Sequence, residues 1–195
     1  MKNKKEKWEE YYLSGKDFIE LDDTYVDELL LFLGNGDKIK NTLDIGCGTG
    51  QILFKLAERG VDVVGVDISP TAIEKAKERF FKDKIQSSYE FYNEYIKKIS
   101  VNKKFDLVIL KLIIAITDDK DELMETVKLY MKENGHCLIV TPIIFPDKEY
   151  SERIQRISIY KDDLYILLKK HFNRIDIFKE EEFDNDVMLG SYLVN

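Results

Sequence analysis

An α/β fold with a mostly parallel sheet is predicted by three features of this sequence: short apolar runs typical of buried strands, amphipathic helical segments between them, and a glycine-rich turn. The first apolar run, Thr42 to Ile45, ends in glycines at positions 46, 48 and 50, and a helical pattern begins at Gln51. Strands that alternate with helices favour a parallel sheet with helices on both faces. We therefore expect a seven-stranded, mostly parallel, doubly wound sheet that ends in a strand pair.

The length of 195 residues suits one domain with a sizeable core. We expect a single domain over residues 1–195, with a helical cap at 1–40 and the core at 41–195. Hydrophobic residues make up 44% of the chain, which excludes disorder of the chain as a whole. The two cysteines have no metal-ligand neighbours in sequence, so we expect neither a disulfide scaffold nor a metal site.

Charge and hydropathy exclude several classes of partner. The formal net charge is −7 and the sequence pI about 5.1, which argues against general affinity for nucleic-acid backbones or anionic lipid. The longest apolar run, 107–116, is interrupted by Lys111 and is shorter than the ~20 residues of a membrane helix. The Lys-rich start has no apolar segment behind it, so we do not expect it to be a secretory signal. We expect a cytoplasmic protein without nucleic-acid or membrane partners and leave its oligomeric state open.

The N-terminal segment combines polar residues with regularly spaced aromatic ones. Trp8, Tyr11 and Tyr12 have the spacing of one helical face. This face either packs on the domain or covers a ligand pocket, and the two interpretations are compatible. A second helix is expected from Asp22 to Leu33.

The remaining elements follow from apolar periodicity and from capping residues. Strands are expected at 41–45, 62–67, 89–92, 105–110, 136–141, 174–178 and 187–194. Helices are expected after Gln51, after Ser69-Pro70, from Thr117 to Met131 with Asn134-Gly135 closing it, and from Lys161 to Phe172. The stretch 142–158 is longer than a typical connection, so it is either a substrate loop or an elaborated connection. An acidic turn, 180–186, is expected between the last two strands.

The glycine spacing distinguishes two classes of ligand. Dinucleotide-binding sites typically have the pattern G-x-G-x-x-G, whereas this turn has G-x-G-x-G. The next strand ends in Asp67, 21 residues after Gly46, near the distance at which a carboxylate meets ribose hydroxyls in a nucleotide-binding unit.

The stretch Leu43-Asp44-Ile45-Gly46-Cys47-Gly48-Thr49-Gly50 resembles motif I of the class I S-adenosylmethionine-dependent methyltransferases. Val64 to Ser69 resembles the acidic second strand of that family, 105–109 its fourth strand, and 131–140 its passage into the fifth strand. The last strand pair is similar to the antiparallel hairpin that separates this family from dinucleotide binders. The resemblance extends from about Thr42 to the C-terminus.

The resemblance implies S-adenosyl-L-methionine as cofactor, with S-adenosyl-L-homocysteine as product, and assigns roles by position. Asp44 lies near the amino group of the cofactor, the turn lies against its methionine part, Asp67 accepts from the ribose hydroxyls, and Ile68 lies against the adenine. The family commonly has an acidic residue near the adenine amine just after the third strand, and Asn93 or Glu94 could serve in that place here. The predicted cofactor-binding residues are Asp44, Gly46, Cys47, Gly48, Gly50, Asp67, Ile68, Asn93, Glu94 and Lys111.

The segment after the fourth strand departs from the family. It reads Lys111 to Thr117 and contains neither histidine nor carboxylate. Methyl transfer depends mainly on alignment, and a general base is needed only where the acceptor must lose a proton. The candidates for a catalytic group are Tyr11, Tyr12 and Lys111. We predict that neither His136 nor His171 is catalytic, because both are expected at the amino edge of the sheet.

The acceptor is inferred mostly from missing patterns. No Asn-Pro-Pro-Tyr-like segment follows the fourth strand and no Pro-Cys pair is present, so the patterns of nucleic-acid base methylation are missing. A small-molecule acceptor is the leading hypothesis. The alternatives are a non-catalytic S-adenosylmethionine-binding partner or sensor protein, a protein methyltransferase, and a nicotinamide-dependent dehydrogenase, which the glycine spacing opposes.

Overall fold

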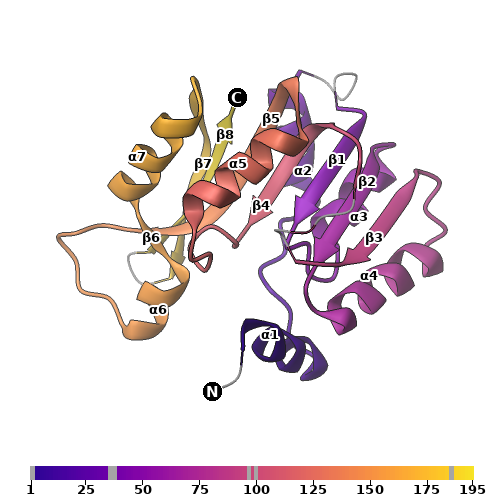
Figure 1. Cartoon of the computed structure of the whole chain (residues 1–195), viewed down its shortest axis with the longest axis horizontal. Helices are drawn as coiled ribbons and strands as arrows, with labels where there is room; N and C mark the ends of the chain where they lie inside the picture. The colour runs from indigo at the N-terminus through magenta and orange to yellow at the C-terminus, as the bar shows by residue number, and fades with distance from the viewer. Residues whose placement is uncertain (1–2, 35–38, 96–97, 99–100, 185–186) are drawn as a thin grey trace. The chain divides into compact units, whose positions relative to one another are not determined.

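The structure is a computed structural model that describes residues 3–34, 39–95, 98, 101–184 and 187–195 (Figure 1). The chain divides into two compact units, residues 1–106 and 107–195. We describe each unit by itself, and the expectation of a single domain with a cap at 1–40 stays a prediction. Within the described residues, no helix is both long and apolar enough to cross a membrane.

The first unit is an α/β layer built on three parallel strands. Strand β1 pairs with β2 and β2 with β3, in a register that sets Asp44 beside Gly65 and Asp67 beside Asn93. Its elements are α1 (Lys4–Leu13), α2 (Asp23–Phe32), β1 (Asn41–Ile45), α3 (Gln51–Glu58), β2 (Asp62–Asp67), α4 (Pro70–Lys82) and β3 (Tyr89–Asn93).

The core of this unit explains a glycine in the middle of a strand. The rings of Phe80 and Phe91 lie 5.0 Å apart, edge to face, against β2. A Cβ on Gly65 would lie 2.7 Å from the Phe91 ring and 2.8 Å from Cys47 Sγ. Only glycine therefore lets the aromatic ring and the turn approach β2 this closely.

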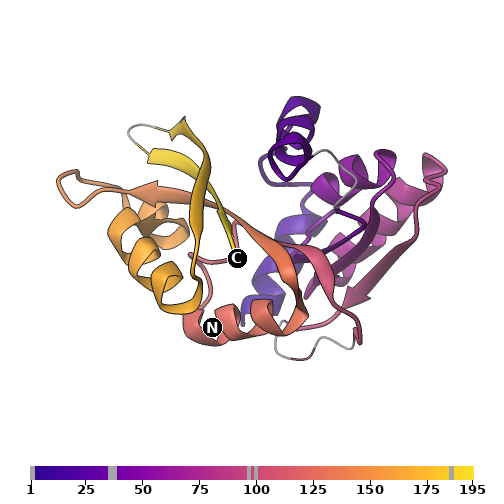
Figure 2. The ribbon, with the colours of Figure 1, turned by 90° about the horizontal axis from the view of Figure 1, so that it is seen from above.

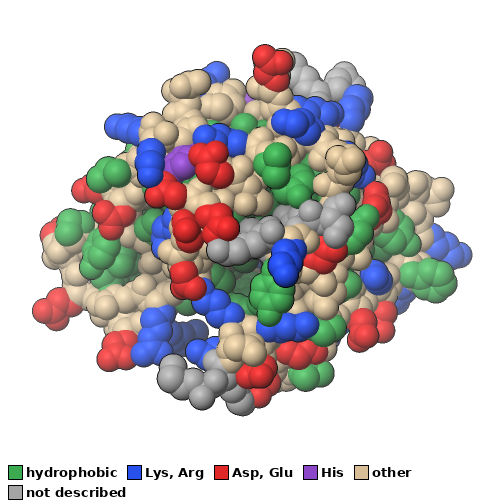
Figure 3. All heavy atoms as spheres, in the orientation of Figure 1, with side chains coloured by type: hydrophobic (Ala, Val, Ile, Leu, Met, Phe, Trp, Pro, Cys, Tyr) green, Lys and Arg blue, Asp and Glu red, His purple; other side chains and the backbone are tan. Residues whose placement is uncertain are grey.

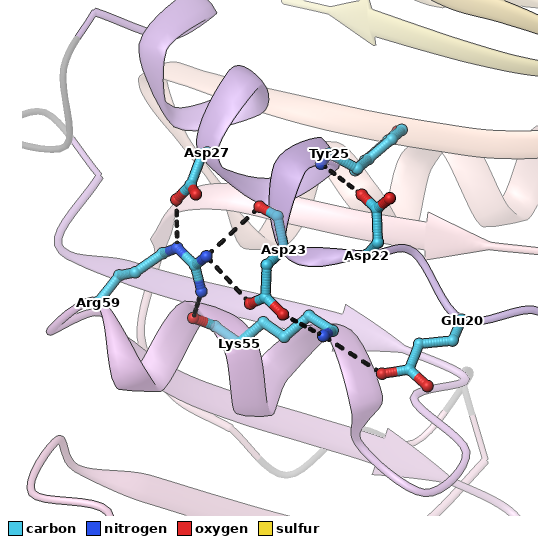
Figure 4. A network of polar contacts seen from close by, with 7 residues as sticks. All are labelled: Glu20, Asp22, Asp23, Tyr25, Asp27, Lys55 and Arg59. Carbon is cyan, nitrogen blue, oxygen red and sulfur yellow. Dashed lines mark hydrogen bonds and ion pairs between the residues drawn. The ribbon is translucent and has the colours of Figure 1, made fainter.

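Helices α2 and α3 are joined by a network of charged side chains (Figure 4). Arg59 donates to the carboxylates of Asp23 and Asp27 at 3.0 and 2.6 Å. Lys55 reaches Asp23 at 2.9 Å and Glu20 at 3.2 Å. The carboxylates are solvent-exposed, so this network orients the N-terminal segment more than it stabilises the fold.

The second unit combines parallel and antiparallel strands. Strand β5 pairs in parallel with the short β6 and antiparallel with β8, which pairs antiparallel with β7. The β7–β8 hairpin is long and twisted (Figure 2). The elements are β4 (Phe105–Lys111, whose first two residues belong to the first unit), α5 (Lys120–Tyr130), β5 (Met131–Ile144), α6 (Glu152–Ile157), β6 (Ile159–Tyr160), α7 (Lys161–His171), β7 (Ile175–Asp184) and β8 (Val187–Val194).

The predicted fold class is confirmed: the strands form a mostly parallel α/β arrangement with an antiparallel C-terminal hairpin, and helices surround them. All seven predicted strands are present. The eighth, β6, has two residues and is too short to leave a periodic pattern in sequence.

The predicted end of the fifth helix was wrong. Helix α5 ends at Tyr130, and Met131 already has extended backbone angles, φ −80° and ψ 138°. Strand β5 begins there, so Asn134-Gly135 lies inside a strand and does not close the helix. An Asn-Gly pair usually marks a turn, and here the long strand overrides that local preference.

The stretch 142–158 is an elaborated connection, one of the two alternatives expected: Pro142 and Ile143 continue β5 opposite Leu189 and Met188, and residues 152–157 form α6. A role in substrate binding stays a prediction. The predicted acidic turn, in contrast, was too long. Within 180–186, residues 180–182 continue β7 opposite β8. Polar strand residues at the exposed side of a sheet resemble a turn in sequence, which explains this error. Residues 185–186 lie outside the described part of the chain.

Candidate functional site

The glycine turn after β1 is held by hydrogen bonds to β2. The carbonyl of Val66 accepts from two consecutive residues of the turn, and the Asp67 carboxylate accepts from a third. The bonds are Gly46 N–H and Cys47 N–H to Val66 O at 2.7 and 3.0 Å, Gly48 N–H to Asp67 Oδ2 at 3.0 Å, and Gly50 N–H to Cys47 O at 3.0 Å. Each of these four N–H groups therefore has an acceptor within the protein.

Two positions of the turn tolerate only glycine, for different reasons. Gly48 and Gly50 have φ of +54° and +71°, the left-handed region that favours glycine. A Cβ on Gly48 would lie 2.6 Å from the Tyr12 hydroxyl oxygen, so this glycine faces the N-terminal helix. A Cβ on Gly50 would lie 3.2 Å from Ala76 Cβ and 3.4 Å from the Phe91 ring, so this glycine packs α3 against the core.

Asp67 connects the turn to the next helix. Its side chain is 8% exposed, and its second carboxylate oxygen accepts from Ser69 N–H at 2.8 Å. Burial raises the pKa of this carboxyl above its ordinary value, and the backbone hydrogen bonds from Ser69 and Gly48 only partly oppose that shift. The structure thus places a buried, hydrogen-bonded carboxylate beside the glycine turn.

The predicted adenine-side residues lie next to Asp67. The Asn93 side-chain amide donates to the Asp67 carbonyl at 3.0 Å, and Glu94 N–H donates to the same oxygen at 3.1 Å. Ile68 is half-buried. The parallel register of β2 and β3 sets Asn93 beside Asp67, and the roles of Asn93 and Glu94 stay predictions.

Two further predicted residues are buried around the turn. Asp44, one residue before the end of β1, is 1% exposed. Cys47 is buried with its Sγ against the position that a Gly65 side chain would take, and burial raises the pKa of its thiol well above the ordinary value. A protonated, enclosed thiol fills space and is no nucleophile.

The N-terminal segment is bound to the glycine turn and to α4 through two carboxylates. Asp17 accepts from Thr49 Oγ1 at 2.5 Å and from Gln51 Nε2 at 3.1 Å. Glu9 accepts from Ser69 Oγ at 2.6 Å and from the Thr71 backbone at 3.3 Å. Neither carboxylate was predicted to belong to the site, because their partners lie 32 and 60 or more residues away in sequence. The only hint was the aromatic helix α1, which contains Glu9 and ends shortly before Asp17.

Tyr12 lies inside this contact, and Tyr11 lies at its edge. Tyr12 is 4% exposed, and burial together with the nearby carboxylates of Asp67 and Asp17 raises the pKa of its phenol. The phenol is therefore protonated at neutral pH and can donate a hydrogen bond, but it is a poor general base. Tyr11 stacks on Phe18 with ring centroids 4.7 Å apart and donates to the Asp17 carbonyl at 2.8 Å.

The other candidates belong to the second unit. Lys111 is the last residue of β4 and is half-buried. His136 lies inside β5, and His171 ends α7, where its ring nitrogens contact Asp121 at 2.6 Å and Glu125 at 3.0 Å. That pairing joins α5 to α7 and gives His171 a structural role, so our prediction that it is not catalytic stands as a prediction.

Comparison with known proteins identifies relatives of the chain. Residues 37–174 match a family model described as a methyltransferase domain. The chain is 30% identical over 171 residues to malonyl-[acyl-carrier protein] O-methyltransferase 2 of Ilyobacter polytropus, an alignment that covers 76% of this chain and 63% of the relative. It is also 30% identical over 174 residues to a putative ribosomal RNA large subunit methyltransferase of Methanocaldococcus jannaschii, covering 82% of this chain and 42% of the relative.

A solved structure shows the same fold. A plantazolicin methyltransferase in complex with a triazolic desmethylPZN analog and SAH has a TM-score of 0.63 and 19% identity, with 88% of this chain and 82% of that chain covered. At this identity the likeness concerns the fold alone. The chain spans less than two thirds of the length of the two curated relatives described above.

Proposed function

We propose that this chain, which belongs to the class I S-adenosylmethionine-dependent methyltransferases, transfers the methyl group of S-adenosylmethionine to a small-molecule acceptor. The observation that carries the proposal is the coupling of the glycine turn to Asp67. The hydrogen bond from Gly48 N–H to this carboxylate unites the two sequence features expected of the cofactor site in one place. The match to the family model covers both features.

The residues around the turn suit this cofactor by charge and by shape. S-adenosylmethionine carries a positive sulfonium and a positive ammonium group against one carboxylate. Buried Asp44 and Asp67 supply negative charge at the ends of β1 and β2. We assign Asp44 to the ammonium group and Asp67 to the ribose hydroxyls, with Asn93 and Glu94 on the adenine side. Gly48 has no side chain to keep the Tyr12 hydroxyl from the turn, so the phenol can lie beside the bound cofactor.

Catalysis in this proposal depends on positioning. When bound, the cofactor supplies a methyl group that is electrophilic because the sulfonium is its leaving group. The chain holds the reactants in line and excludes water, and the aromatic residues of α1 provide an apolar cover over the turn. Tyr12 acts as a hydrogen-bond donor in this arrangement. Lys111 remains a candidate for contact with the cofactor or the acceptor, and no residue is assigned as general base.

A small acceptor fits the charge of the molecule better than a nucleic acid does. The net charge is −7, and on the face shown in Figure 3 acidic and basic side chains are interspersed without a large basic area. Binding to a phosphate backbone needs clustered Lys and Arg. The putative ribosomal RNA methyltransferase among the relatives makes RNA the acceptor that a direct test must include.

The test separates cofactor binding from turnover. Isothermal titration with S-adenosylmethionine, S-adenosylhomocysteine and NAD⁺ is expected to show binding of the first two alone. Incubation with methyl-labelled cofactor and a panel of carboxylic acids, phenols, amines and total RNA is expected to label a small molecule. Tight cofactor binding with no labelled product in any fraction would favour the non-catalytic sensor, and binding of NAD⁺ alone would overturn the proposal.

A further inference from the structure

The second unit contains a pocket that the cofactor site does not account for. It has a volume of about 490 Å³ and is lined by residues from the end of β5, the start of α5, helix α6, strand β6 and the start of α7. In open α/β sheets ligands bind beyond the carboxyl ends of the strands, and this pocket lies beyond the ends of β5 and β6. The lining residues that matter for its chemistry are Ala115, Lys120, Ile144, Ser158, Tyr160 and Asp163.

Ser158 lines this pocket and carries a hydroxyl that lacks a hydrogen-bond partner among the described residues. The residue is 8% exposed, and its hydroxyl oxygen is buried and has no hydrogen-bond partner among the described residues. A buried hydroxyl left unsatisfied costs about 1–3 kcal/mol. Such a group beside a pocket of this size is best explained by a ligand that completes its hydrogen bonds.

Two opposite charges line the same pocket and do not pair with each other. The Lys120 ammonium, on the half-buried first residue of α5, donates to the Thr117 carbonyl at 3.0 Å and has two further N–H donors. Asp163, in the first turn of α7, is exposed. Across the part of the chain that the structure describes, neither group forms an ion pair. The pocket therefore offers one cationic and one anionic contact at once.

The lining of the pocket also includes the polar side chain of Gln155 and several apolar side chains. Ala115 and Ile144 supply aliphatic surface, and Tyr160, which is 40% exposed, supplies an aromatic side chain at the rim. Pockets of about 300–1,000 Å³ with a few placed polar groups are typical of small-molecule sites.

We propose that this pocket binds a small zwitterionic amino-carboxylate. The carboxylate of the ligand pairs with Lys120, its ammonium group pairs with Asp163, and one of its oxygens hydrogen-bonds the Ser158 hydroxyl. Its side chain lies against Ile144 and Tyr160. The ligand is also the methyl acceptor, an assignment that rests on the proposed function.

The experiment measures binding directly on the full chain, with and without S-adenosylhomocysteine. The standard amino acids are screened by saturation-transfer NMR, and each one that binds is compared with its N-acetyl form, which lacks the ammonium group, and its methyl ester, which lacks the carboxylate. Each blocked form is expected to bind at least about tenfold more weakly, since one ion pair is lost.

Variants then assign each contact. Lys120→Met is expected to weaken amino-acid binding about tenfold and to leave the methyl ester unaffected, whereas Asp163→Asn is expected to leave the N-acetyl form unaffected. Ser158→Ala is expected to weaken all three forms. Lys128→Met is the matched control, because Lys128 lies on the same helix and pairs with Glu125 instead. Binding that none of the pocket variants changes, or no preference for the zwitterion, would overturn the inference.

A cofactor titration on the same sample separates the two proposals. If S-adenosylmethionine binds and no amino acid does, the pocket inference fails and the proposed function stands. If amino acids bind in a manner that depends on Lys120 and the cofactor does not bind, the pocket inference stands and the proposed function fails.

Discussion

The glycine turn of the first unit and the pocket of the second unit differ in how far their polar groups are already satisfied. At the turn, both carboxylate oxygens of Asp67 accept backbone hydrogen bonds, and Asp17 accepts from Thr49 and Gln51. At the pocket, the Ser158 hydroxyl has no partner among the described residues. Asp67 and Asp17 are therefore held in place by the protein, whereas the Ser158 hydroxyl is left for a ligand to complete.

This difference has a physical consequence for how the donor site and the acceptor site bind their ligands. A site whose groups are held by the protein binds its ligand without losing further conformational freedom. A site with unsatisfied groups discriminates strongly, because a wrong ligand leaves a buried polar atom unpaired. The donor site is therefore expected to be insensitive to the acceptor, and the pocket is expected to set specificity.

The largest effect is expected from Gly48→Ala. Its Cβ would lie 2.6 Å from the Tyr12 hydroxyl, and the backbone φ of +54° strains any L-residue by about 1–2 kcal/mol. We expect the Kd for S-adenosylhomocysteine to rise about 100-fold, measured by titration calorimetry. Gly60→Ala is the control, since its φ is +83° and its Cβ would meet nothing within 4 Å. Equal affinities in the two variants would show that the turn does not hold the cofactor.

A smaller loss of cofactor affinity is expected from Asp67→Asn. The amide keeps the size of the side chain but removes its charge and turns a donor toward either Gly48 N–H or Ser69 N–H. We expect Kd to rise about 10-fold or more, with the loss confined to ligands that keep both ribose hydroxyls. Comparing S-adenosylhomocysteine with its 2′-deoxy form checks this, and an unchanged difference between them would remove Asp67 from the ribose site.

Loss of stability without loss of the cofactor contacts is expected from Ser69→Ala. The Ser69 hydroxyl caps α4 by accepting from Ala72 N–H at 3.1 Å and donates to Glu9 at 2.6 Å. Removing a cap of this kind costs about 1–2 kcal/mol, measured by urea denaturation. Thr126→Ala serves as a control, because its hydroxyl only bonds the preceding turn of α5.

A pH-dependent effect is expected in the second unit from Glu180→Gln. Burial opposes ionisation of Glu180, but hydrogen bonds from Lys161 at 2.8 Å and Tyr192 at 2.6 Å outweigh it and lower the pKa of this carboxyl. A lowered pKa stabilises the fold above the ordinary value of 4.5 and ceases to do so as pH falls through the folded-state pKa. The variant is therefore expected to lose about 1 kcal/mol at neutral pH and progressively less in acid.

The same denaturation series on Glu181→Gln controls for general charge effects. Glu181 lies on the same strand and contacts Lys179 at 3.3 Å, with 55% of its side chain exposed. Its substitution is expected to change the free energy of unfolding little at either pH. A gap between Glu180→Gln and the natural protein that does not narrow in acid would mean that packing, not charge, explains the effect.

The smallest effect on stability is expected from Ser158→Ala. A buried hydroxyl without a hydrogen-bond partner destabilises the fold through its desolvation cost, and the substitution removes that cost. The free energy of unfolding is therefore expected to change by less than about 0.5 kcal/mol or to rise. The comparison with Ser69→Ala is direct, since both serines are buried. A loss as large as that of Ser69→Ala would show that Ser158 is satisfied in solution and would weaken the case for a ligand there.

Local patterns in the sequence were sufficient for most of the fold. Residues 62–67 form the strand that their apolar run predicts, and Ser69-Pro70 begins α4 as its capping chemistry requires. The errors occur where a strand runs through residues that are typical of a turn, as at Asn134-Gly135 and at 180–182. At 180–182 pairing with β8 decides the outcome, and a single sequence does not display its pairing.

The sequence by itself predicted the turn from Gly46 to Gly50 and the carboxylate of Asp67. The turn is predictable because a backbone that passes close to neighbouring groups tolerates only glycine at certain positions. Tertiary structure alone decided that Asp17 and Glu9 hold the N-terminal segment to that turn, and that Lys120, Ser158 and Asp163 line one pocket. These contacts join residues tens of positions apart. They depend on which side chains the folded backbone brings together, and no local spacing encodes that.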